Sequence, residues 1–482
     1  MVERYANCIN GKWLAPGTGD YVANINPADP AEILGMFPAS GGADVEQAIA
    51  AAVAASEGWR RVPGPERGKL LLRFADLLEQ HTDPLAKILT KEQGKPLKES
   101  VGEVKRAAAE SRFMAGEASR LAGETLPSER QGVWVQVIRE PLGVVGAIMP
   151  WNFPVVTPVR KLAPALACGN TVVFKPASDT PWTGVYLMEL LLEAGFPPGA
   201  VNLVMGPGSL VGQKLAESPL VQGITFTGST TTGRRIYAAT AQHLGRVQLE
   251  LGGKNPAVVM DAYDLEEAAK EIVSAAFAAS GQRCTAISRV LTSRAEATKL
   301  TEIIVDLASK LKVGNGLSPE VEVGPLVSQA QLEIVEGYIE TAKKEGARVL
   351  TGGKRLPELG KGFYYSPTVL DKVTPKSVVA KEEVFGPVLP IIVVDSMEEA
   401  LTICNDTEYG LAACVFTKDI DKAMQFATEI KTGMVHINHG TASQAHVPFG
   451  GVKNSGQGAY SIGGTAKDFC MVNKVVYLKF NQ

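Results

Sequence analysis

One cysteine and one glutamate stand in segments whose composition favours chemistry at a carbonyl group. Cys284 lies in Gly281-Gln282-Arg283-Cys284-Thr285, and Glu250 lies upstream, directly before Leu251-Gly252-Gly253-Lys254. A thiolate can attack a carbonyl carbon and form a covalent intermediate, and a carboxylate can activate the water that releases it. A thiol and a carboxylate held together are therefore a minimal set of groups for oxidising an aldehyde.

Length and composition restrict the class of protein that can position these groups. The chain has 482 residues, too long for one ordinary core, so we expect two or three domains. The net charge is −3, and no cluster of lysine and arginine forms a basic face, so we expect no nucleic-acid partner. The longest apolar stretch, 143–159, is interrupted by Pro150, Pro154 and Pro158, so we expect no membrane span.

The cysteines and histidines indicate a reduced protein without a structural metal. The chain has six cysteines and five histidines, and no two cysteines form a CxxC pair, so we expect no metal site. No signal segment is visible at the start, and we predict a cytoplasmic location. We interpret the cysteines other than Cys284 as small buried apolar residues; they are Cys8, Cys168, Cys404, Cys414 and Cys470.

The elements that must position the two reactive groups alternate between strand and helix. This rhythm predicts parallel sheets with helices on both faces. The predicted strands are 143–148, 171–174, 201–204, 223–226 and 257–260, and the predicted helices are 158–168, 182–194, 211–217 and 265–280. Two further extended segments, 132–138 and 474–480, could pair with each other or with another subunit, because an apolar strand left at an edge is exposed.

Two glycine-rich turns follow predicted strands and could hold phosphate groups. The segment 206–212 is one residue too long for the dinucleotide fingerprint, and 228–233 lacks the Lys and Ser/Thr that a P-loop requires. Both segments can still place backbone N–H groups and a helix N-terminus near a pyrophosphate. Ordinary glycine-rich turns remain an equally good interpretation of the spacing alone.

Seven motifs together resemble the motif set of the NAD(P)-dependent aldehyde dehydrogenase superfamily, in its order and at its spacing, over nearly the whole chain. Each motif is weakly specific alone, whereas the set is very specific. The motifs are Pro150-Trp151-Asn152-Phe153-Pro154, Phe174-Lys175-Pro176-Ala177-Ser178, Phe226-Thr227-Gly228-Ser229, Glu250-Leu251-Gly252-Gly253-Lys254, Gly281-Gln282-Arg283-Cys284, Glu383-Val384-Phe385-Gly386-Pro387 and Pro448-Phe449-Gly450-Gly451-Val452-Lys453.

The resemblance implies an α/β fold with a doubly wound nucleotide-binding domain, an α/β catalytic domain and a small β oligomerisation element. We place the nucleotide-binding domain at 1–120 and 141–252, and the catalytic domain at 253–447. We place the oligomerisation element at 121–140 and 455–482. Because a strand of this element completes a neighbour's sheet in the family, we expect a homodimer or homotetramer.

The resemblance also implies roles for four residues near the reaction. Cys284 matches the nucleophile, and the side chain of Asn152 matches an oxyanion donor that acts with the backbone N–H of Cys284. Losing one such donor typically costs about 3–4 kcal/mol in the barrier. Glu250 matches the base that activates water for deacylation; CoA-dependent relatives generally lack it, so hydrolysis to a free acid is expected. Lys161 matches a supporting lysine near the active centre.

For the cofactor, the resemblance implies that Lys175 contacts the adenosine ribose and Glu383 the nicotinamide ribose, with Phe385 packed beside it. NAD-preferring members often carry a glutamate where this chain has Ser178. A neutral hydroxyl does not repel a 2′-phosphate, so we predict that NADP is accepted alongside NAD. The other expected cofactor positions are Ile148, Pro150, Trp151, Gly208, Phe226, Gly228, Ser229 and Leu251.

Three residues resemble the substrate site of the semialdehyde dehydrogenases. Arg160 and Ser443 match positions at which the succinate semialdehyde branch binds a distal carboxylate, and Arg283 is a second candidate donor. That branch has a further arginine where this chain has Ala278, and the segment 284–289 looks more like 2-oxoglutarate semialdehyde dehydrogenases. We therefore predict a short aldehyde with a distal carboxylate, with 2-oxoglutarate semialdehyde ahead of succinate semialdehyde.

Several alternatives remain open from the sequence. Arg160 and Arg283 could form structural ion pairs, and the substrate could be an uncharged or hydroxy aldehyde of a broad-specificity enzyme. The chain could also be a non-enzymatic structural member of the fold. A cysteine hydrolase would need a histidine beside Cys284, and none of the histidines lies in a recognisable hydrolase signature.

Overall fold

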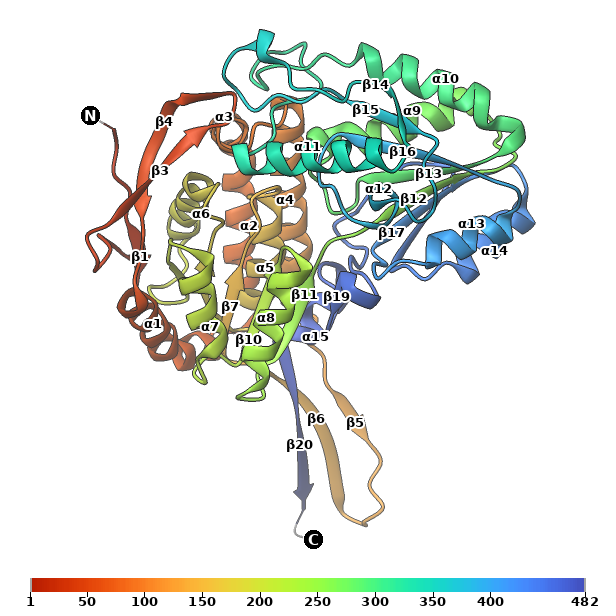
Figure 1. The fold of residues 1–482 in the computed structure, drawn as a ribbon. Coiled ribbons are helices and arrows are strands. Elements are labelled where there is room, and N and C mark those ends of the chain that lie inside the picture. The colour runs from red at the N-terminus through yellow and green to blue at the C-terminus, as the bar shows by residue number, and fades with distance from the viewer. Residues whose placement is uncertain (1, 481–482) are drawn as a thin grey trace.

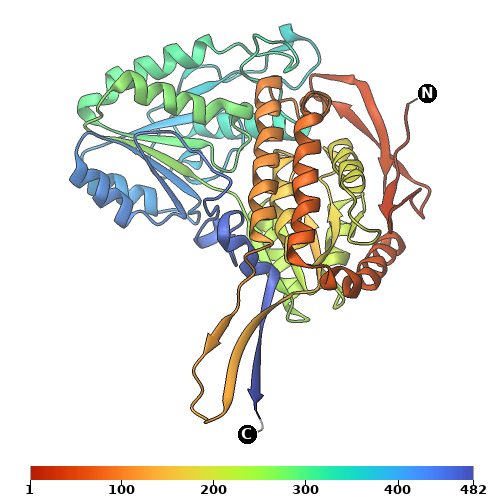
Figure 2. The same ribbon diagram turned by 180° about the vertical axis from the view of Figure 1, so that it is seen from behind.

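Two large sheets with helices packed on them form the body of the protein, and a narrow three-stranded arm projects from it (Figures 1 and 2). This computed structural model describes residues 2–480; Met1 and residues 481–482, the end of the predicted oligomerisation element, lie outside the described residues. Within that range, no helix has the length and apolar character needed to cross a membrane.

The first sheet has eight strands in the order β19-β11-β10-β7-β8-β9-β1-β2, and its five central strands, β11 to β9, are parallel. The chain passes from β7 to β8 and β9 on one side, then returns to β10 on the other side of β7. Ligands of such doubly wound sheets bind outside the carboxyl ends of the strands at this switch point. The strands are β1 Asn7–Ile9, β2 Lys12–Leu14, β7 Val144–Ile148, β8 Thr171–Lys175, β9 Val201–Leu203, β10 Gly223–Thr227, β11 Arg246–Glu250 and β19 Gly456–Gln457.

Helices cover both faces of this sheet because successive strand residues point to opposite sides. Val144 belongs to the core under α1, α7 and α8, whereas Val145 belongs to the core under α2 to α6. The predicted strands and helices of this region are confirmed, except that 211–217 begins as a π-turn, η1 Gly208–Gly212. The helices are α1 Gly42–Arg61, α2 Gly64–Gln80, α3 Thr82–Gln93, α4 Leu97–Glu117, α5 Val156–Ala167, α6 Pro181–Ala194, α7 Gln213–Glu217 and α8 Thr230–Ala241.

Buried glutamates from the α2–α4 layer satisfy the N-termini of α5 and α6, which have no side-chain cap of their own. Glu103 accepts hydrogen bonds from Val155 N at 2.8 Å and Val156 N at 3.1 Å, at the start of α5. Glu92 accepts from Trp182 N and Thr183 N, both at 2.7 Å, at the start of α6. A carboxylate is favourable there because the first N–H groups of a helix lack partners.

The second sheet has seven strands in the order β14-β15-β16-β13-β12-β17-β18 and is parallel except for β14 at its edge. α9 and α10 cover one face, and α11 to α14 cover the other. The strands are β12 Asn255–Val259, β13 Ile287–Ser293, β14 Arg348–Thr351, β15 Thr368–Asp371, β16 Val388–Val394, β17 Ala412–Phe416 and β18 Met434–Ile437. The helices are α9 Leu265–Phe277, α10 Arg294–Lys310, α11 Gln329–Lys344, α12 Val378–Lys381, α13 Met397–Asn405 and α14 Ile420–Glu429.

The projecting arm joins two segments that are far apart in the sequence. β20 pairs antiparallel with β6 from Met471 opposite Pro141 to Lys479 opposite Val133, which confirms that the two extended segments pair with each other. Apolar side chains such as Trp134 and Tyr477 are exposed on this arm. The remaining elements are β3 Tyr21–Asn26, β4 Asp29–Pro38, β5 Glu124–Leu126, β6 Val133–Pro141, α15 Ala466–Cys470 and β20 Met471–Lys479.

Candidate active site

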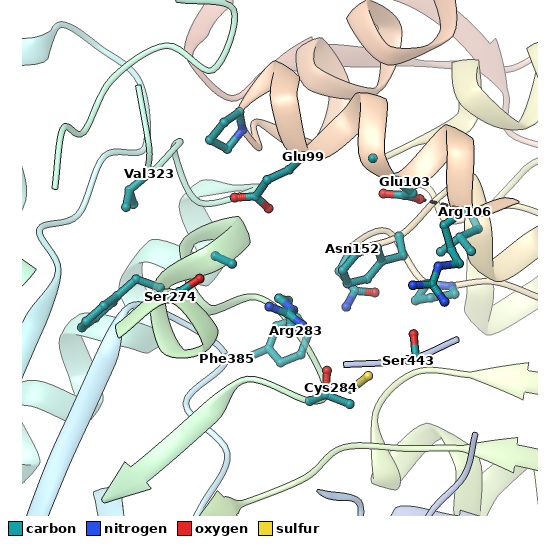
Figure 3. A pocket seen from close by; sticks show the side chains of 18 of the residues that line it. Glu99, Glu103, Arg106, Asn152, Ser274, Arg283, Cys284, Val323, Phe385 and Ser443 are labelled. Atoms are coloured by element: carbon teal, nitrogen blue, oxygen red, sulfur yellow. Dashed lines mark hydrogen bonds between the residues drawn. The ribbon is translucent and has the colours of Figure 1, made fainter. Parts of the chain in front are cut away.

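A deep cleft of about 1450 Å³ lies between the carboxyl edge of the first sheet, the N-terminal half of α4 and the loops of the second sheet. Figure 3 shows Cys284 and Ser443 on one side of it and Glu103 and Arg106 on another. Most residues that the sequence analysis selected meet in this cleft: Pro150, Trp151, Asn152, Arg160, Gly228, Ser229, Glu250, Leu251, Arg283, Cys284, Glu383, Phe385 and Ser443.

The chain reaches Cys284 through a tight turn. The helix predicted up to Ser280 is wrong in its last turn, because α9 ends at Phe277 and Ala279 and Ser280 adopt left-handed φ angles of 50° and 59°. Such angles are unfavourable for residues with a side chain, so the surroundings must hold them. Ser280 Oγ donates a hydrogen bond to Gly324 O at 2.7 Å, which ties the turn to a neighbouring loop and directs Cys284 into the cleft.

Cys284 differs from the other cysteines in its exposure. It is partly exposed in the cleft, whereas the other five are buried, as predicted. Burial raises the pKa of the Cys284 thiol to about 12, and the charges of Glu250 and Glu383 raise it further, against the opposing effect of Arg160 and Arg283. These surroundings favour the neutral thiol over the thiolate, and removal of the proton makes the sulfur a nucleophile.

Asn152 lies directly beside the cysteine loop. Its Nδ2 donates a hydrogen bond to Gln282 O at 3.0 Å, two residues before Cys284. The side chain of Gln282 accepts from Val327 N at 2.9 Å, so this loop is anchored on both sides. The arrangement places a side-chain amide donor next to the backbone of the cysteine loop, as an oxyanion site requires.

Glu250 ends β11 and is almost fully buried beside Lys161 of α5. Lys161 Nζ lies 3.0 Å from Glu250 Oε1 and donates to Gln248 Oε1 at 3.3 Å. Burial lowers the pKa of Lys161, and the charge of Glu250 opposes this effect. Thr227 Oγ1 lies within 3.4 Å of the other carboxylate oxygen. Lys161 does not line the cleft itself; it balances the charge of Glu250 from behind.

Two parts of the cleft are suited to bind a nucleotide, namely the N-terminus of α8 and the carboxylate of Glu383. Ser229 caps α8 by accepting from Thr232 N, and the first N–H groups of this helix lie at the cleft beside Gly228. Glu383 accepts a hydrogen bond from Gly253 N at 3.0 Å, which leaves its second oxygen available for a hydroxyl group. These residues fit a phosphate and a ribose, respectively.

Phe385 and Trp151 form the wall next to Glu383. Their rings meet edge to face, with centroids 5.4 Å apart and an interplanar angle of 89°. Phe385 holds a left-handed φ of 55°, and its backbone carbonyl accepts from Gln331 Nε2 at 3.0 Å. A strained backbone held by specific contacts is typical of functional sites, and here it fixes an aromatic surface on which a planar ring can pack.

Lys175, Ser178 and Gly208 lie outside this cleft, at the carboxyl ends of β8 and β9. Ser178 Oγ donates to Gly206 O at 3.3 Å, which brings the two loops together. Lys175 is buried and donates to Pro176 O at 2.8 Å; among residues 2–480 no carboxylate forms an ion pair with it, although the charge of Asp179 raises its pKa against the effect of burial. Burial lowers the pKa of Lys175 to about 8. An under-satisfied ammonium at this edge fits the hydroxyl groups or phosphate of an adenosine ribose.

Two predicted cofactor positions, Ile148 and Phe226, lie in the apolar core between the sheet and α7 and α8. They support the loops that follow β7 and β10 from behind. A Cβ added to Gly212 would lie 3.6 Å from the side chain of Ile148, an ordinary packing contact. Ile148 and Phe226 would therefore affect a nucleotide site indirectly, by fixing the loops that follow β7 and β10.

Arg160 is already engaged by an acidic residue. Its Nε and one terminal nitrogen donate to Glu110 of α4 at 3.2 and 2.9 Å, and its guanidinium lies 4.6 Å from the ring centroid of Phe449. Arg160 is 8% exposed, and the side chain of Glu110 is 1% exposed. Arg160 lines the cleft, yet most of its hydrogen-bonding capacity serves this buried ion pair.

Arg106 is the residue that the sequence analysis missed. It is partly buried in the cleft wall on α4, and no residue within 2–480 forms a hydrogen bond or ion pair with it. Burial lowers the pKa of Arg106, Glu110 raises it and Arg160 lowers it. The spacing of Glu99, Glu103, Arg106 and Glu110 is that of one helical face, so a charged stripe on a buried helix was the available signal.

A histidine partner for Cys284 is absent from the described lining of the cleft. His436 of β18 and His439, in the loop after this strand, meet edge to face, with ring centroids 5.0 Å apart and an interplanar angle of 86°. A cysteine hydrolase, which needs such a base, is therefore not supported.

A cleft at the carboxyl edge of a doubly wound sheet is typical of an enzyme that binds a dinucleotide. Residues 13–476 match the model of the Aldehyde dehydrogenase family. The chain belongs to this family and is an NAD(P)-dependent aldehyde dehydrogenase, as the sequence motifs predicted.

Similar proteins include several semialdehyde dehydrogenases. The chain is 44% identical over 479 residues to the alpha-ketoglutaric semialdehyde dehydrogenase of Bacillus subtilis, covering 98% of each protein. It is 42% identical over 455 residues to the mitochondrial succinate-semialdehyde dehydrogenase of Arabidopsis thaliana, covering 94% of this chain and 86% of that protein.

Solved structures share the whole fold. A 3,6-anhydro-L-galactose dehydrogenase in complex with NAP has a TM-score of 0.96 and 35% identity, with 99% of this chain and 100% of that chain covered. A betaine aldehyde dehydrogenase from Staphylococcus aureus in complex with NAD+ has a TM-score of 0.97 and 34% identity, with 99% and 95% covered.

Proposed function

We propose that the protein oxidises a short aldehyde with a distal carboxylate to the corresponding acid, through a covalent intermediate on Cys284. The observation that carries this proposal is the unpaired Arg106 guanidinium, which lines the same cleft as the partly exposed thiol. A guanidinium whose N–H groups have no hydrogen-bond or ion-pair partner inside a cleft is suited to bind a carboxylate.

In the first step, Cys284 Sγ attacks the aldehyde carbon, and the carbonyl oxygen takes up negative charge. Asn152 Nδ2 and the backbone N–H of Cys284 donate to this oxygen, and two such donors are worth most when water is excluded. Burial and neighbouring carboxylates raise the pKa of Cys284, so the thiol keeps its proton until attack, and this proton passes to solvent water as the bond between sulfur and carbon forms. Arg160 and Arg283, which lower this pKa, favour the thiolate.

The nicotinamide cofactor, when bound, supplies the acceptor for the hydride that leaves the substrate carbon. Glu383 and the aromatic wall of Phe385 and Trp151 would hold its ribose and ring. The acyl group that remains on Cys284 is a thioester. Glu250 then takes a proton from a water molecule, the resulting hydroxide attacks the acyl carbon, and the thiol and a carboxylic acid are released.

For the cofactor, we propose that both NADP and NAD are used. Ser178 is an exposed neutral hydroxyl and Lys175 is a buried cation with spare donors, so a 2′-phosphate meets no acidic side chain at position 178. A comparison of kcat/KM for the two cofactors tests this. A preference for NAD above about a hundredfold, roughly 2.7 kcal/mol, would contradict it.

For the substrate, we propose 2-oxoglutarate semialdehyde ahead of succinate semialdehyde. Two guanidinium groups, Arg106 and Arg160, line one wall of the cleft, and Arg283 and Ser443 lie near the thiol, so several donors can serve a carboxylate and a second oxygen. The names of the similar semialdehyde dehydrogenases support the same class. A panel of aldehydes of matched length tests it: equal kcat/KM for uncharged aldehydes would favour a broad-specificity enzyme.

We also propose the assembly, the domain roles and the location. The first sheet would bind the nucleotide, and the second would carry the nucleophile. The arm exposes apolar side chains on β20, and β18 is an open strand edge, so a homodimer or homotetramer in which the arm covers a neighbour is favoured. All six cysteines are free thiols, in agreement with a reducing cytoplasm.

A further inference from the structure

A buried ion pair lies directly behind the turn that carries Asn152, and the reaction described above does not use it. Lys95 Nζ is 2.8 Å from Glu103 Oε2, and both side chains are at most 1% exposed. The same ammonium donates to the backbone carbonyl of Asn152 at 2.6 Å and lies 4.0 Å from the ring centroid of Phe153. One cation therefore holds the carbonyl group of the proposed oxyanion donor.

Glu103 fixes the other end of the same turn. Its second oxygen accepts from Val155 N at 2.8 Å and from Val156 N at 3.1 Å, where α5 begins. The pair thus contacts the backbone of the turn on both sides of Phe153 through three hydrogen bonds. The backbone at Asn152 has little freedom left, because its carbonyl group and the following helix start are both anchored. The side chain extends from this fixed backbone to Gln282 O, to which Nδ2 donates at 3.0 Å.

The energetics of the pair point to positioning rather than to stability. Taking two charges out of water costs several kcal/mol per ion, and buried pairs are often replaceable by apolar side chains without loss of stability. Hydrogen bonds to charged groups are short and directional, so they define position better than apolar contacts do. A donor in an oxyanion site must be held to within about an ångström, since such a displacement can cost about a hundredfold in rate.

We propose that Lys95 and Glu103 are positioning residues that set the place of the Asn152 amide relative to Cys284. The proposal rests on the oxyanion role of Asn152 proposed above. Neither residue reaches the reacting atoms in this arrangement. Their effect passes through the backbone of the 152–156 turn.

The test is a double-mutant cycle between Lys95→Met and Asn152→Ala, read by the rate constant of the first NAD(P)H turnover. Lys95→Met leaves the Glu103 carboxylate buried without its counter-charge, so we expect a lower melting temperature. In the folded fraction we expect this rate constant to fall by about 10- to 100-fold, with the cofactor Kd unchanged. In the Asn152→Ala background the same substitution should cost less than twofold, because there is no amide left to place. In the Lys95→Met enzyme, alkylation of Cys284 by iodoacetamide should keep its wild-type rate.

Glu103→Gln is the second variant, since it keeps an oxygen for the two amides but removes the charge that holds Lys95. It should show the same loss of rate and the same lack of additivity with Asn152→Ala. Glu92→Gln is the matched control, because Glu92 caps α6 in the same way without contact to the 152–156 turn. We expect it to lower thermal stability and leave the first-turnover rate constant within twofold of wild type.

Any of three results would overturn the inference, two because the pair is structural and one because the proposed oxyanion role fails. If the Lys95→Met and Asn152→Ala effects multiply, or if the Lys95 and Glu103 variants lose thermal stability alone, the pair is structural. If Asn152→Ala by itself leaves the first-turnover rate unchanged, the proposed oxyanion role fails, and the positioning role fails with it. The two failures are distinguishable, because the second is visible in the single Asn152 variant.

Discussion

Replacing Arg106 by alanine should separate substrate recognition from stability. Arg106 lines the cleft without a hydrogen-bond or ion-pair partner within residues 2–480, so its removal leaves no buried charge behind. A hydrogen bond to a charged group contributes about 1.5–3 kcal/mol. We therefore expect kcat/KM for an anionic semialdehyde to fall roughly 10- to 150-fold, with little change in thermal stability.

Arg160→Ala is the contrasting substitution. It removes the partner of Glu110, whose side chain is 1% exposed, and leaves an uncompensated carboxylate in the protein interior. Breaking a buried pair in this way costs about 3–5 kcal/mol in the free energy of unfolding. A loss of activity in Arg160→Ala would therefore mix recognition with misfolding, whereas a loss in Arg106→Ala would report recognition.

The assay is kcat/KM for succinate semialdehyde and for butanal, an uncharged aldehyde of equal chain length, together with thermal unfolding of each variant. The prediction requires a selective loss for the anionic substrate in Arg106→Ala. An equal loss for both aldehydes, or no loss for either, would refute the assignment of Arg106 to the carboxylate. Equal wild-type kcat/KM for both aldehydes would instead refute the anionic substrate class.

Three other perturbations test the cofactor site and the reactive groups. Gly252→Ala should weaken cofactor binding about tenfold, because the added Cβ would collide with Glu383 Oε2; an unchanged Kd in a fluorescence titration would contradict this. The Kd for NADP should be nearly constant between about pH 7 and pH 8 and rise about tenfold per pH unit above it, because burial lowers the pKa of Lys175 to about 8 and the anion binds its charged form; Lys175→Met should abolish that rise. Glu250→Gln should speed alkylation of Cys284 by iodoacetamide in cofactor-free enzyme, since the Glu250 charge raises the pKa of the thiol; slower alkylation would show that Glu250 accepts the thiol proton.

The main elements of the fold could be predicted from the sequence because their patterns are local. The apolar segment of β8 and the helix α6, ended by Gly195 with φ of 94°, follow from runs and caps that lie within a few residues. The turn at Ala279 and Ser280 could not be predicted, since its left-handed backbone is held by Gly324 from another loop. The helical periodicity of α9 continues through residues 279 and 280, so the sequence predicts a helix where the structure has this turn.

The site residues likewise fall into two groups: those that local motifs predict, and those whose roles depend on how the helices pack. The motifs led to Cys284, Glu250 and Asn152, and all three face one cleft. The ion pair of Arg160 with Glu110 depends on the packing of α5 against α4, which no local pattern encodes. Arg106 was missed for the same reason: its helix carries no motif, and only the packed structure shows which of its faces meets the cleft.

The central claim is that Cys284 carries the acyl group during the reaction, and detection of this acyl-enzyme tests it most directly. Glu250→Gln enzyme is mixed with semialdehyde and NAD(P)+, quenched in acid and analysed by mass spectrometry, with NAD(P)H measured in parallel. The account predicts one acyl group on the peptide that contains Cys284, one NAD(P)H per active site and almost no further turnover. Absence of the acyl group from Cys284, or NAD(P)H formation by Cys284→Ala at the wild-type rate, would contradict it.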